Sequence, residues 1–260
     1  MKNSFYLTVI SILISSPAYA WNRIVTLNPM ISEWTAEMLG QDKVFQKIVG
    51  ASEYSHYPDF MKKVSTVGPY PQLQIEKILS LHPDLVIGSV EYNRADQLEK
   101  LKQLKLNVVV LPKENFHQMK EWLMELGKAL NETEAAQKTA LVWEKEMGTI
   151  KSHLKHKRVF FEVQFQPLIT VGRDSFLTEA FQFAGFENIF DHIPQAYPKV
   201  SREAVLQKKP VNVFVLEMIK DPTELSKIKI AWKNSEVTFL NGDDFSRCSL
   251  RLLRALKELK

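Results

Sequence analysis

The sequence predicts an α/β protein: two Rossmann-like lobes with central parallel sheets, joined by one long rigid helix. The first observation is a repeat. Residues 74–87 have the pattern of a short helix that contains a Glu, is stopped by a Pro and is followed by an apolar strand. Residues 201–214 have the same pattern, with Glu, Leu and Pro at one constant offset. The second is that each half opens with an apolar strand, a proline turn and a helix that stops at Gly40 or Gly185.

Residues 1–20 have the features of a cleavable signal peptide. Lys2 gives a positive start, residues 5–14 are apolar but too few to cross a membrane as a helix, and Ala18 and Ala20 form a small-x-small cleavage site. No other stretch approaches the roughly 20 apolar residues that a spanning helix needs, and the cleavage site offers no Cys to a lipid. We therefore expect a soluble protein that is exported to a periplasm.

Composition narrows the class of protein further. The chain has 260 residues, 45% of them hydrophobic, which suits one or two folded domains. Its only cysteine, Cys248, excludes an internal disulfide. The net charge of +4 is modest and the lysines are spread along predicted helices, so nothing indicates a partner nucleic acid.

The N-terminal ligand-binding lobe is predicted to span residues 21–130, with strands and helices in alternation. This order is typical of a parallel sheet covered by helices. In chain order the expected elements are a strand at 23–27, a helix at 31–39, a strand at 48–50, the repeat helix at 74–80, a strand at 85–87, a helix at 94–104, a strand at 108–111 and a helix at 116–130.

The connection, residues 131–156, is predicted to be one backbone helix. From Glu132 to Leu154 there is no Pro and Gly occurs only at position 148, while apolar residues recur at helical spacing. At 1.5 Å per residue such a helix covers roughly 30 Å, the width of a small domain. Because it would hold the lobes stiffly, we expect only small lobe motion on binding.

The C-terminal ligand-binding lobe, residues 157–260, follows the same plan. The expected elements are a strand at 159–163, a helix after residues 172–175, a turn at 184–190, the second repeat helix, a strand at 213–216, a helix at 224–232, a strand at 237–240, a polar loop at 241–249 and a terminal helix from Leu250.

Ligands of open α/β sheets lie beyond the carboxyl ends of the strands, where this chain is rich in tyrosines and acids. Tyr70 and Tyr197 precede the Glu of their repeats by the same number of residues, so a similar ring is expected to face the cleft from each lobe. Such rings stack on a large, flat, mostly apolar ligand. The other candidates in these loops are Tyr54, Tyr57, Tyr92, Phe245, Glu53, Asp243 and Asp244.

Familiar catalytic motifs are missing from the sequence. There is no phosphate-binding glycine loop, no Gly-x-Ser-x-Gly and no His-Glu-x-x-His. Of the histidines only His153 and His156 are close together, on the charged end of a helix, so we predict no metal site, no cofactor and no enzyme. The alternative from another class is an exported hydrolase with Glu53, Asp243 and Asp244 as acid and base, which only the presence of these carboxylates favours.

Glu76 and Glu203 are the other matched pair. One explanation for a Glu at both positions is the helix dipole, which stabilises an acid in the first turn of a helix by about 0.3–1 kcal/mol. The second explanation is that one exposed carboxylate in each lobe docks on arginines of a two-fold symmetric partner. Because the Glu recurs in the repeat, we give both explanations equal weight.

Four segments carry a family resemblance. Residues 51–58, 64–87, 187–190 and 197–203 together resemble the helical-backbone substrate-binding proteins of ABC importers, and among these the periplasmic cobalamin-binding proteins. The resemblance covers nearly the whole mature chain. It implies a monomer that carries cobalamin or a related corrinoid to a permease dimer in the inner membrane.

The resemblance also implies site residues. Glu76 and Glu203 match two glutamates that engage permease arginines, while Tyr70 and Tyr197 stand where two tryptophans flank the corrin. The remaining implied ligand contacts are Tyr54 and the loop residues Asp243, Asp244, Phe245, Ser246 and Arg247. The chain departs from the pattern at Ser89, Ile169 and Asp244, which replace expected aromatics, and at Ala184, which replaces a cysteine.

The nearest rival is a haem or ferric-siderophore carrier of the same fold, in which Tyr54 or Tyr70 ligates iron or packs beside it. Anionic siderophores need several cations, whereas Arg94, Arg173 and Arg247 are the only arginines expected near the cleft. This count favours a neutral or weakly charged ligand.

Overall fold

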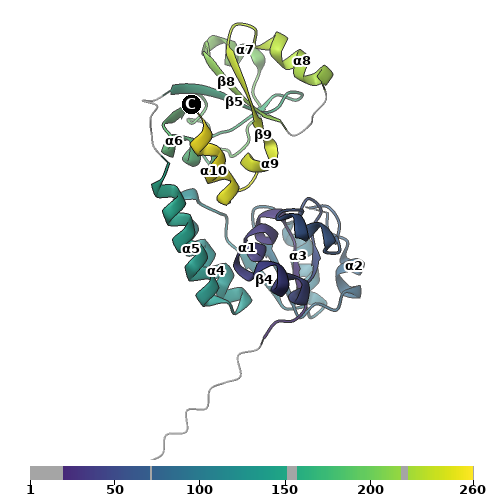
Figure 1. The fold of residues 1–260 in the computed structure, drawn as a ribbon. Helices are drawn as coiled ribbons and strands as arrows, with labels where there is room; N and C mark the ends of the chain where they lie inside the picture. Colours follow the sequence, from purple (N-terminus) through teal and green to yellow (C-terminus); the bar gives the residue numbers. More distant parts are fainter. Residues whose placement is uncertain (1–19, 71, 151–156, 218–221, 260) are drawn as a thin grey trace, which may run out of the picture.

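The computed structural model describes residues 20–70, 72–150, 157–217 and 222–259. The predicted signal peptide, apart from Ala20, and the predicted end of the backbone helix, residues 151–156, lie outside this range. The described chain forms two sheets with their helices, one from each half of the sequence (Figure 1). The predicted α/β class with parallel sheets is confirmed.

The N-terminal sheet has the strand order β2-β1-β3-β4, and all its pairings are parallel. Its strands are β1 (Ile24–Thr26), β2 (Ile48–Ala51), β3 (Leu85–Ser89) and β4 (Val108–Leu111). The helices of this half are α1 (Pro29–Lys47), α2 (Ile75–Ser80), α3 (Ala95–Gln103) and α4 (Met119–Leu130), with 3₁₀ turns at Asp59–Lys63 and Phe116–Gln118. Gly40, predicted to end a helix, instead interrupts α1, where its φ of 72° breaks the helical path.

The C-terminal sheet has the order β6-β5-β8-β9, with β7 also paired to β5. Its strands are β5 (Lys157–Gln164), β6 (Ile169–Thr170), β7 (Phe186–Asn188), β8 (Asn212–Glu217) and β9 (Glu236–Asn241). The helices are α6 (Phe176–Phe183), α7 (Arg202–Gln207), α8 (Pro222–Ala231), α9 (Gly242–Phe245) and α10 (Leu250–Glu258). The pairing of β6 with β5 is antiparallel, which the alternation of strands and helices did not predict.

The helix between the sheets is shorter than predicted. It is α5 (Thr133–Gly148), and Thr149 follows as its C-cap, so the helix ends at the glycine that the prediction ran through. Gly is the poorest helix former after Pro, which explains the end point. The prediction of a single helix over residues 131–156 is therefore wrong for residues 131–150, the part that the structure describes.

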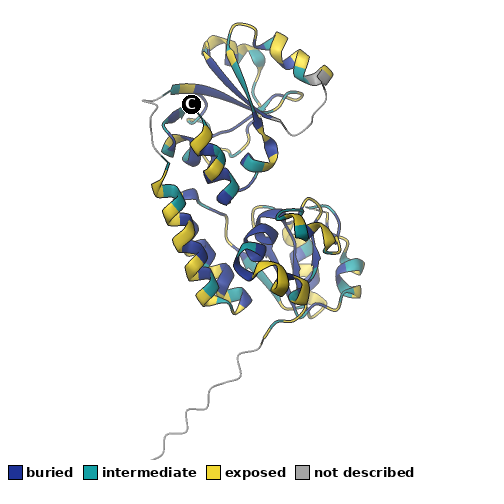
Figure 2. Ribbon diagram, viewed as in Figure 1, coloured by how far each residue is buried: buried dark blue, intermediate teal, exposed yellow. Residues whose placement is uncertain are grey.

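A continuous hydrophobic core, rather than one long helix, holds the two halves of the chain rigidly together. It includes buried residues of both halves (Figure 2). Rings contact one another across it: Trp34 meets Trp143, Trp143 meets Phe116, and Phe116 meets Phe183, with centroids 5.6 to 5.8 Å apart. Separating the halves would break this packing, so the prediction of small lobe motion has a new physical basis.

Glu132, in the turn between α4 and α5, gives the first testable prediction. Burial favours a higher pKa, but hydrogen bonds from Lys47 and Lys43 outweigh it and hold the pKa of Glu132 below its usual value. The carboxylate therefore stabilises the fold above pH 4.5, its unperturbed pKa, and this contribution is lost as the pH falls through the folded-state pKa.

We expect Glu132→Gln to have a lower unfolding midpoint than the native protein at pH 7, with the difference shrinking as the pH is lowered below 4.5. Thermal unfolding at a series of pH values measures the difference. A difference that stays constant until the native protein unfolds in acid would contradict the role of the carboxylate charge.

Candidate functional site

The loops at the carboxyl ends of both sheets converge on a cavity between the two halves. Its volume is about 10 Å³, roughly the space that one water molecule needs. Asn28, Pro29 and Met30 at the start of α1, Tyr70, and Tyr92 after β3 come from the first half, and Ser246 and Arg247 after α9 come from the second. The cavity therefore lies where ligands of open α/β sheets bind, and both halves build it.

Three tyrosines lie at or near this cavity. The rings of Tyr70 and Tyr92 meet edge to face with centroids 6.0 Å apart, and burial raises the pKa of Tyr70. Although 43% of its surface is exposed, burial among the cleft residues raises the pKa of Tyr197 to about 12, and the charges of Glu114 and Glu91 act in the same direction. Tyr197, from the second half, thus stands close to acids of the first half.

Arg247 links the two halves beside the cavity. Only 7% of its surface is exposed, and burial lowers its pKa. Its Nη2 donates a hydrogen bond of 3.1 Å to the carbonyl oxygen of Tyr54, and its Nη1 lies 3.9 Å from carboxylate oxygens of Glu33 and Asp243. A buried guanidinium with these partners fixes the loop after α9 against α1 and the loop after β2.

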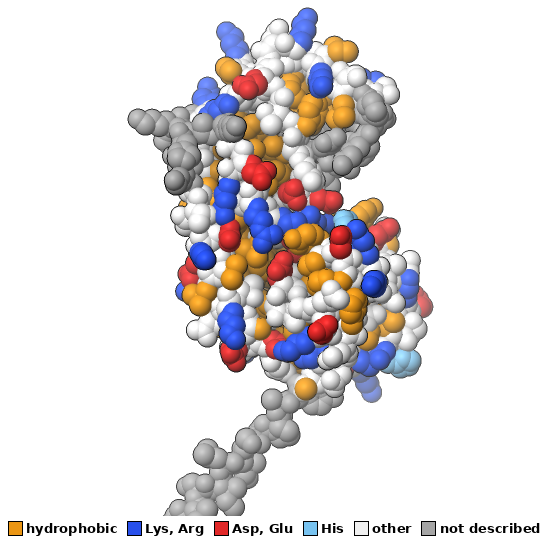
Figure 3. Space-filling model, viewed as in Figure 1, with side chains coloured by type: hydrophobic (Ala, Val, Ile, Leu, Met, Phe, Trp, Pro, Cys, Tyr) orange, Lys and Arg blue, Asp and Glu red, His pale blue; other side chains and the backbone are white. Residues whose placement is uncertain are grey.

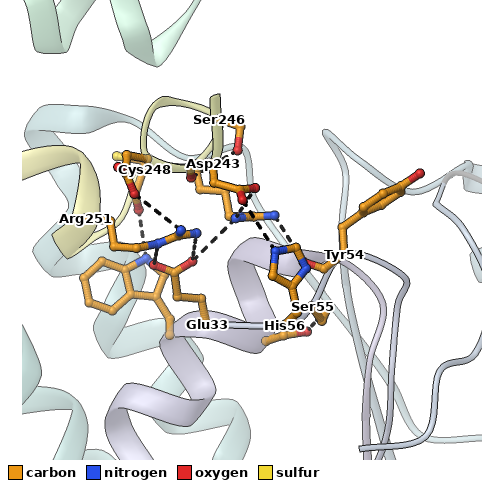
Figure 4. Close-up of polar contacts among 12 residues, drawn as sticks. Glu33, Tyr54, Ser55, His56, Asp243, Ser246, Cys248 and Arg251 are labelled. Carbon is orange, nitrogen blue, oxygen red and sulfur yellow. Dashed lines mark hydrogen bonds and ion pairs between the residues drawn. The ribbon is translucent and has the colours of Figure 1, made fainter. Parts of the chain in front are cut away.

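Arg251 makes a two-pronged ion pair between the halves. Its Nε and Nη2 donate to the two carboxylate oxygens of Glu33 at 3.2 and 3.0 Å (Figure 4), and its Nη1 lies 3.4 Å from Asp244. The indole of Trp34, one residue further along α1, donates to the carbonyl oxygen of Cys248 at 2.9 Å. In the space-filling view, acidic and basic side chains gather where the halves meet (Figure 3).

The predicted ligand contacts Tyr54 and Asp243 lie at the rim of this cluster. Tyr54 is 58% exposed, has a left-handed φ of 66°, and points its ring away from the polar contacts (Figure 4). Asp243 lies 3.6 Å from the imidazole of His56. The ring of Tyr54 is thus free to meet a ligand, whereas Asp243 already lies beside His56 and Arg247.

The other predicted loop residues are placed differently from one another. Ser246 lines the cavity. Burial raises the pKa of Asp244, which lies 3.4 Å from Arg251 and is not among the residues that line the cavity. Phe245 is 3% exposed and stacks on Phe181 at 5.6 Å, so its ring belongs to the core and supports the turn that carries Ser246.

Glu76 and Glu203 occupy equivalent places at the starts of α2 and α7, and both are exposed. The backbone N–H of Glu203 and the hydroxyl of Ser201 hold the pKa of Glu203 below its usual value. Each of the two helices therefore presents one exposed Glu side chain to solvent.

Sequence reasoning missed the cavity-lining residues Asn28, Pro29 and Met30. It also missed three charged residues near the cavity, Glu114, Arg251 and Glu33. Glu114 follows β4, and the rule that ligands lie beyond strand ends was a signal for it. Arg251 lies four residues after Arg247, in the first turn of α10, and its nearness to the loop that carries Arg247 could have been noticed in the sequence. Glu33 gave no signal, because nothing in the sequence pairs α1 with α10.

The described residues contain no group of three or more His, Cys, Asp or Glu side chains that could hold a metal ion. Within the same part of the chain, no helix combines the length and apolar character that crossing a membrane requires.

The chain is similar to curated proteins over its whole length. It is 30% identical over 269 residues to a vitamin B12-binding protein of Salmonella typhi, a match that covers 100% of this chain and 97% of the relative. It is also 30% identical over 254 residues to a vitamin B12-binding protein of Vibrio vulnificus strain CMCP6, covering 95% and 91%.

Solved structures give the same fold. The periplasmic vitamin B12-binding protein BtuF of Vibrio cholerae is 28% identical, with a TM-score of 0.76 over 92% of this chain and 94% of that one. The periplasmic haem-binding protein RhuT of Roseiflexus sp. RS-1 has a TM-score of 0.78 at 20% identity, over 91% and 95% of the two chains.

A family model described as periplasmic binding protein matches residues 24–238, which include both sheets up to β9. The hydrolase alternative finds no support in these matches. The chain belongs to the periplasmic binding protein family, a family of transport proteins that bind their substrates and are not enzymes.

Proposed function

We propose that the protein captures cobalamin or a related corrinoid between its two halves and delivers it to an ABC-transporter permease. The observation that carries the proposal is the cavity between the halves, where Tyr70 and Tyr92 meet Arg247 and Tyr197 lies nearby. The names of the full-length relatives at 28 to 30% identity agree with it.

The size of the cavity indicates how a corrinoid would enter. At about 10 Å³ it holds about one water molecule and is far smaller than a typical ligand pocket of roughly 300–1,000 Å³. A corrin ring would therefore occupy the space above the cavity, after the rim loops that carry Tyr54 and Tyr197 have moved apart. The continuous core behind the cleft limits that movement to the loops and to small shifts of the halves.

Family membership implies a periplasmic location and work with an ABC transporter. Beyond this we propose that residues 1–20 direct export, that residues 21–130 and 157–260 act as the two ligand-binding lobes, and that a monomer docks on a permease dimer through Glu76 and Glu203. The exposure of both glutamates, one in each half, supports this docking mode.

A haem or ferric-siderophore carrier is the second candidate, because similar folds include haem-binding proteins and the exposed Tyr54 hydroxyl could reach an iron atom. The carboxylates of such ligands need cations. Arg247 and Arg251 already face Glu33, Asp243 and Asp244, which favours a ligand without net negative charge.

Calorimetric titration with cyanocobalamin tests the proposal. We expect one site per chain with micromolar or tighter affinity, and about tenfold or greater weakening in Tyr70→Ala, since truncating a central interface tyrosine costs about 1–2 kcal/mol or more. Tyr57→Phe is the control, because Tyr57 packs against Arg251 outside the cavity lining. Unchanged affinity in Tyr70→Ala would contradict the site, and no binding by the native protein would contradict the function.

A further inference from the structure

Tyr92, which lines the cavity, is held both at its backbone and at its hydroxyl. It lies in the turn after β3, where the buried side-chain amide of Asn93 accepts from the backbone N–H of Ser89 at 2.9 Å and donates to the carbonyl oxygen of Leu27 at 3.0 Å. At the other end, the Tyr92 hydroxyl donates a hydrogen bond to Oε1 of Glu114. The ring between these two points therefore has little freedom to turn.

Glu114 is a buried carboxylate, 2% exposed, whose other oxygen has no hydrogen-bond partner among the described residues. Glu114 and Tyr92 follow the adjacent parallel strands β4 and β3, so they meet at the same edge of the sheet. Burial raises the pKa of Glu114, and the bond from Tyr92 opposes that shift because it stabilises the charged form. Breaking the bond would leave a buried carboxylate without this donor, so the pair is expected to stay together.

The backbone that carries Glu114 is held by the C-terminal half. Glu179 in α6 accepts from the side-chain amide of Asn115 at 3.0 Å and from the backbone N–H of Phe116 at 2.9 Å. The ring of Phe116 is fully buried and meets Trp143 with centroids 5.6 Å apart. The carboxylate of Glu114 thus extends from a segment that the second half fixes in place.

The ring of Tyr92 in turn contacts the ring of Tyr70. The two rings meet at 84° with centroids 6.0 Å apart. Edge-to-face contacts of this kind favour one relative orientation of the rings. A Tyr92 ring that cannot turn therefore restricts the tilt of Tyr70, and a contact surface that is ordered before binding loses less entropy when the ligand arrives.

We propose that Glu114 is a positioning residue for ligand binding: it holds the ring of Tyr92, and through it the ring of Tyr70, in the orientation that meets the ligand. Glu114 itself is buried behind Tyr92 and acts through the tyrosine hydroxyl. Glu179 is the anchor, so the tyrosine pair of the N-terminal half depends on a carboxylate of the C-terminal half. This inference rests on the proposed function and adds to it residues that act without touching the ligand.

The test is a double-mutant cycle on the affinity for cyanocobalamin, measured by calorimetry at pH 7. Tyr92→Phe removes the donor and keeps the ring, whereas Glu114→Met removes the acceptor and fills the space. Each is expected to weaken binding by about three- to tenfold, the range that one aromatic pair contributes. The double variant should bind within about twofold of the weaker single variant, because both changes remove the same hydrogen bond.

Two further variants separate positioning from a general loss of structure. Glu114→Gln should bind within about twofold of the native protein, because its amide oxygen can still accept from Tyr92. Tyr57→Phe, the matched control, should also keep the native affinity, since Tyr57 does not line the cavity. If Glu114→Met fails to fold, the comparison of Tyr92→Phe with Glu114→Gln still decides, because weakening in the first and not in the second is the expected result.

Native affinity in Tyr92→Phe, or single effects that multiply in the double variant, would overturn the positioning role while leaving corrinoid binding in place. Equal weakening in Glu114→Gln and Tyr92→Phe would overturn it as well, since the amide keeps an acceptor for the hydroxyl. Failure of the native protein to bind cyanocobalamin at all would overturn the proposed function and the positioning role with it.

Discussion

Replacing Glu33 with alanine is expected to lower the free energy of unfolding by about 3–5 kcal/mol. Glu33 is 2% exposed and accepts two hydrogen bonds from Arg251, while Nη1 of Arg247 lies 3.9 Å away. Removal of this carboxylate leaves two largely buried guanidinium groups facing each other without their shared counter-charge. Urea unfolding, followed by tryptophan fluorescence, measures the change.

The matched control is Glu134→Ala on α5, an exposed i,i+4 pair with Lys138. Water screens such exposed pairs and they add little stability, so the control should be nearly as stable as the native protein. A Glu33→Ala variant that matched the control would show that the ion pairs between α1 and α10 do not hold the halves together. If Glu33→Ala is much less stable but still binds cyanocobalamin tightly, Glu33 acts on stability and not on ligand binding.

The second large effect concerns delivery. The double variant Glu76→Ala/Glu203→Ala is expected to reduce uptake of cyanocobalamin by cells tenfold or more while its affinity stays within twofold of the native value. Both carboxylates are exposed at helix starts outside the cavity lining, so their loss removes two charged contacts to a permease and none to the ligand. Uptake of labelled cyanocobalamin in cells that lack the native protein measures the first effect, and calorimetry the second.

Glu99→Ala/Glu236→Ala is the matched control, because it also removes one exposed acid from each half. Glu99 pairs with Lys102 on α3, and Glu236 begins β9 at the end of the sheet opposite the cleft. This control should transport normally. Equal loss of uptake in both double variants would indicate a general effect of charge, and a large loss of affinity in the first would count against docking.

Local patterns were enough to predict most of the fold. The repeat placed α2 with β3 and α7 with β8 correctly, because a proline after a short helix and an apolar run are local signals. The short strands β6 and β7 were missed, since two or three residues give no periodicity. The long helix was overextended because apolar spacing continued past Gly148, and spacing alone does not show where a helix ends.

The candidate site was predictable only in part. Tyr70, Ser246 and Arg247 were found from the repeat and the family resemblance, and they do line one cavity. The contacts of Glu33 with Arg251 join residues that are far apart in the sequence, so no local pattern could reveal them. The core position of Phe245 depends on Phe181, a contact between α9 and α6 that is equally non-local.

The central claim, that this protein selects a corrinoid, is tested most directly by competition in one sample. The purified protein is mixed with equimolar cyanocobalamin and haemin in slight excess, unbound ligand is removed by gel filtration, and the absorption spectrum of the protein fraction is recorded. Our account predicts the spectrum of cyanocobalamin at one equivalent per chain. A haem spectrum in that fraction would contradict it, leaving the fold and the transport family in place and assigning the cleft to iron chemistry.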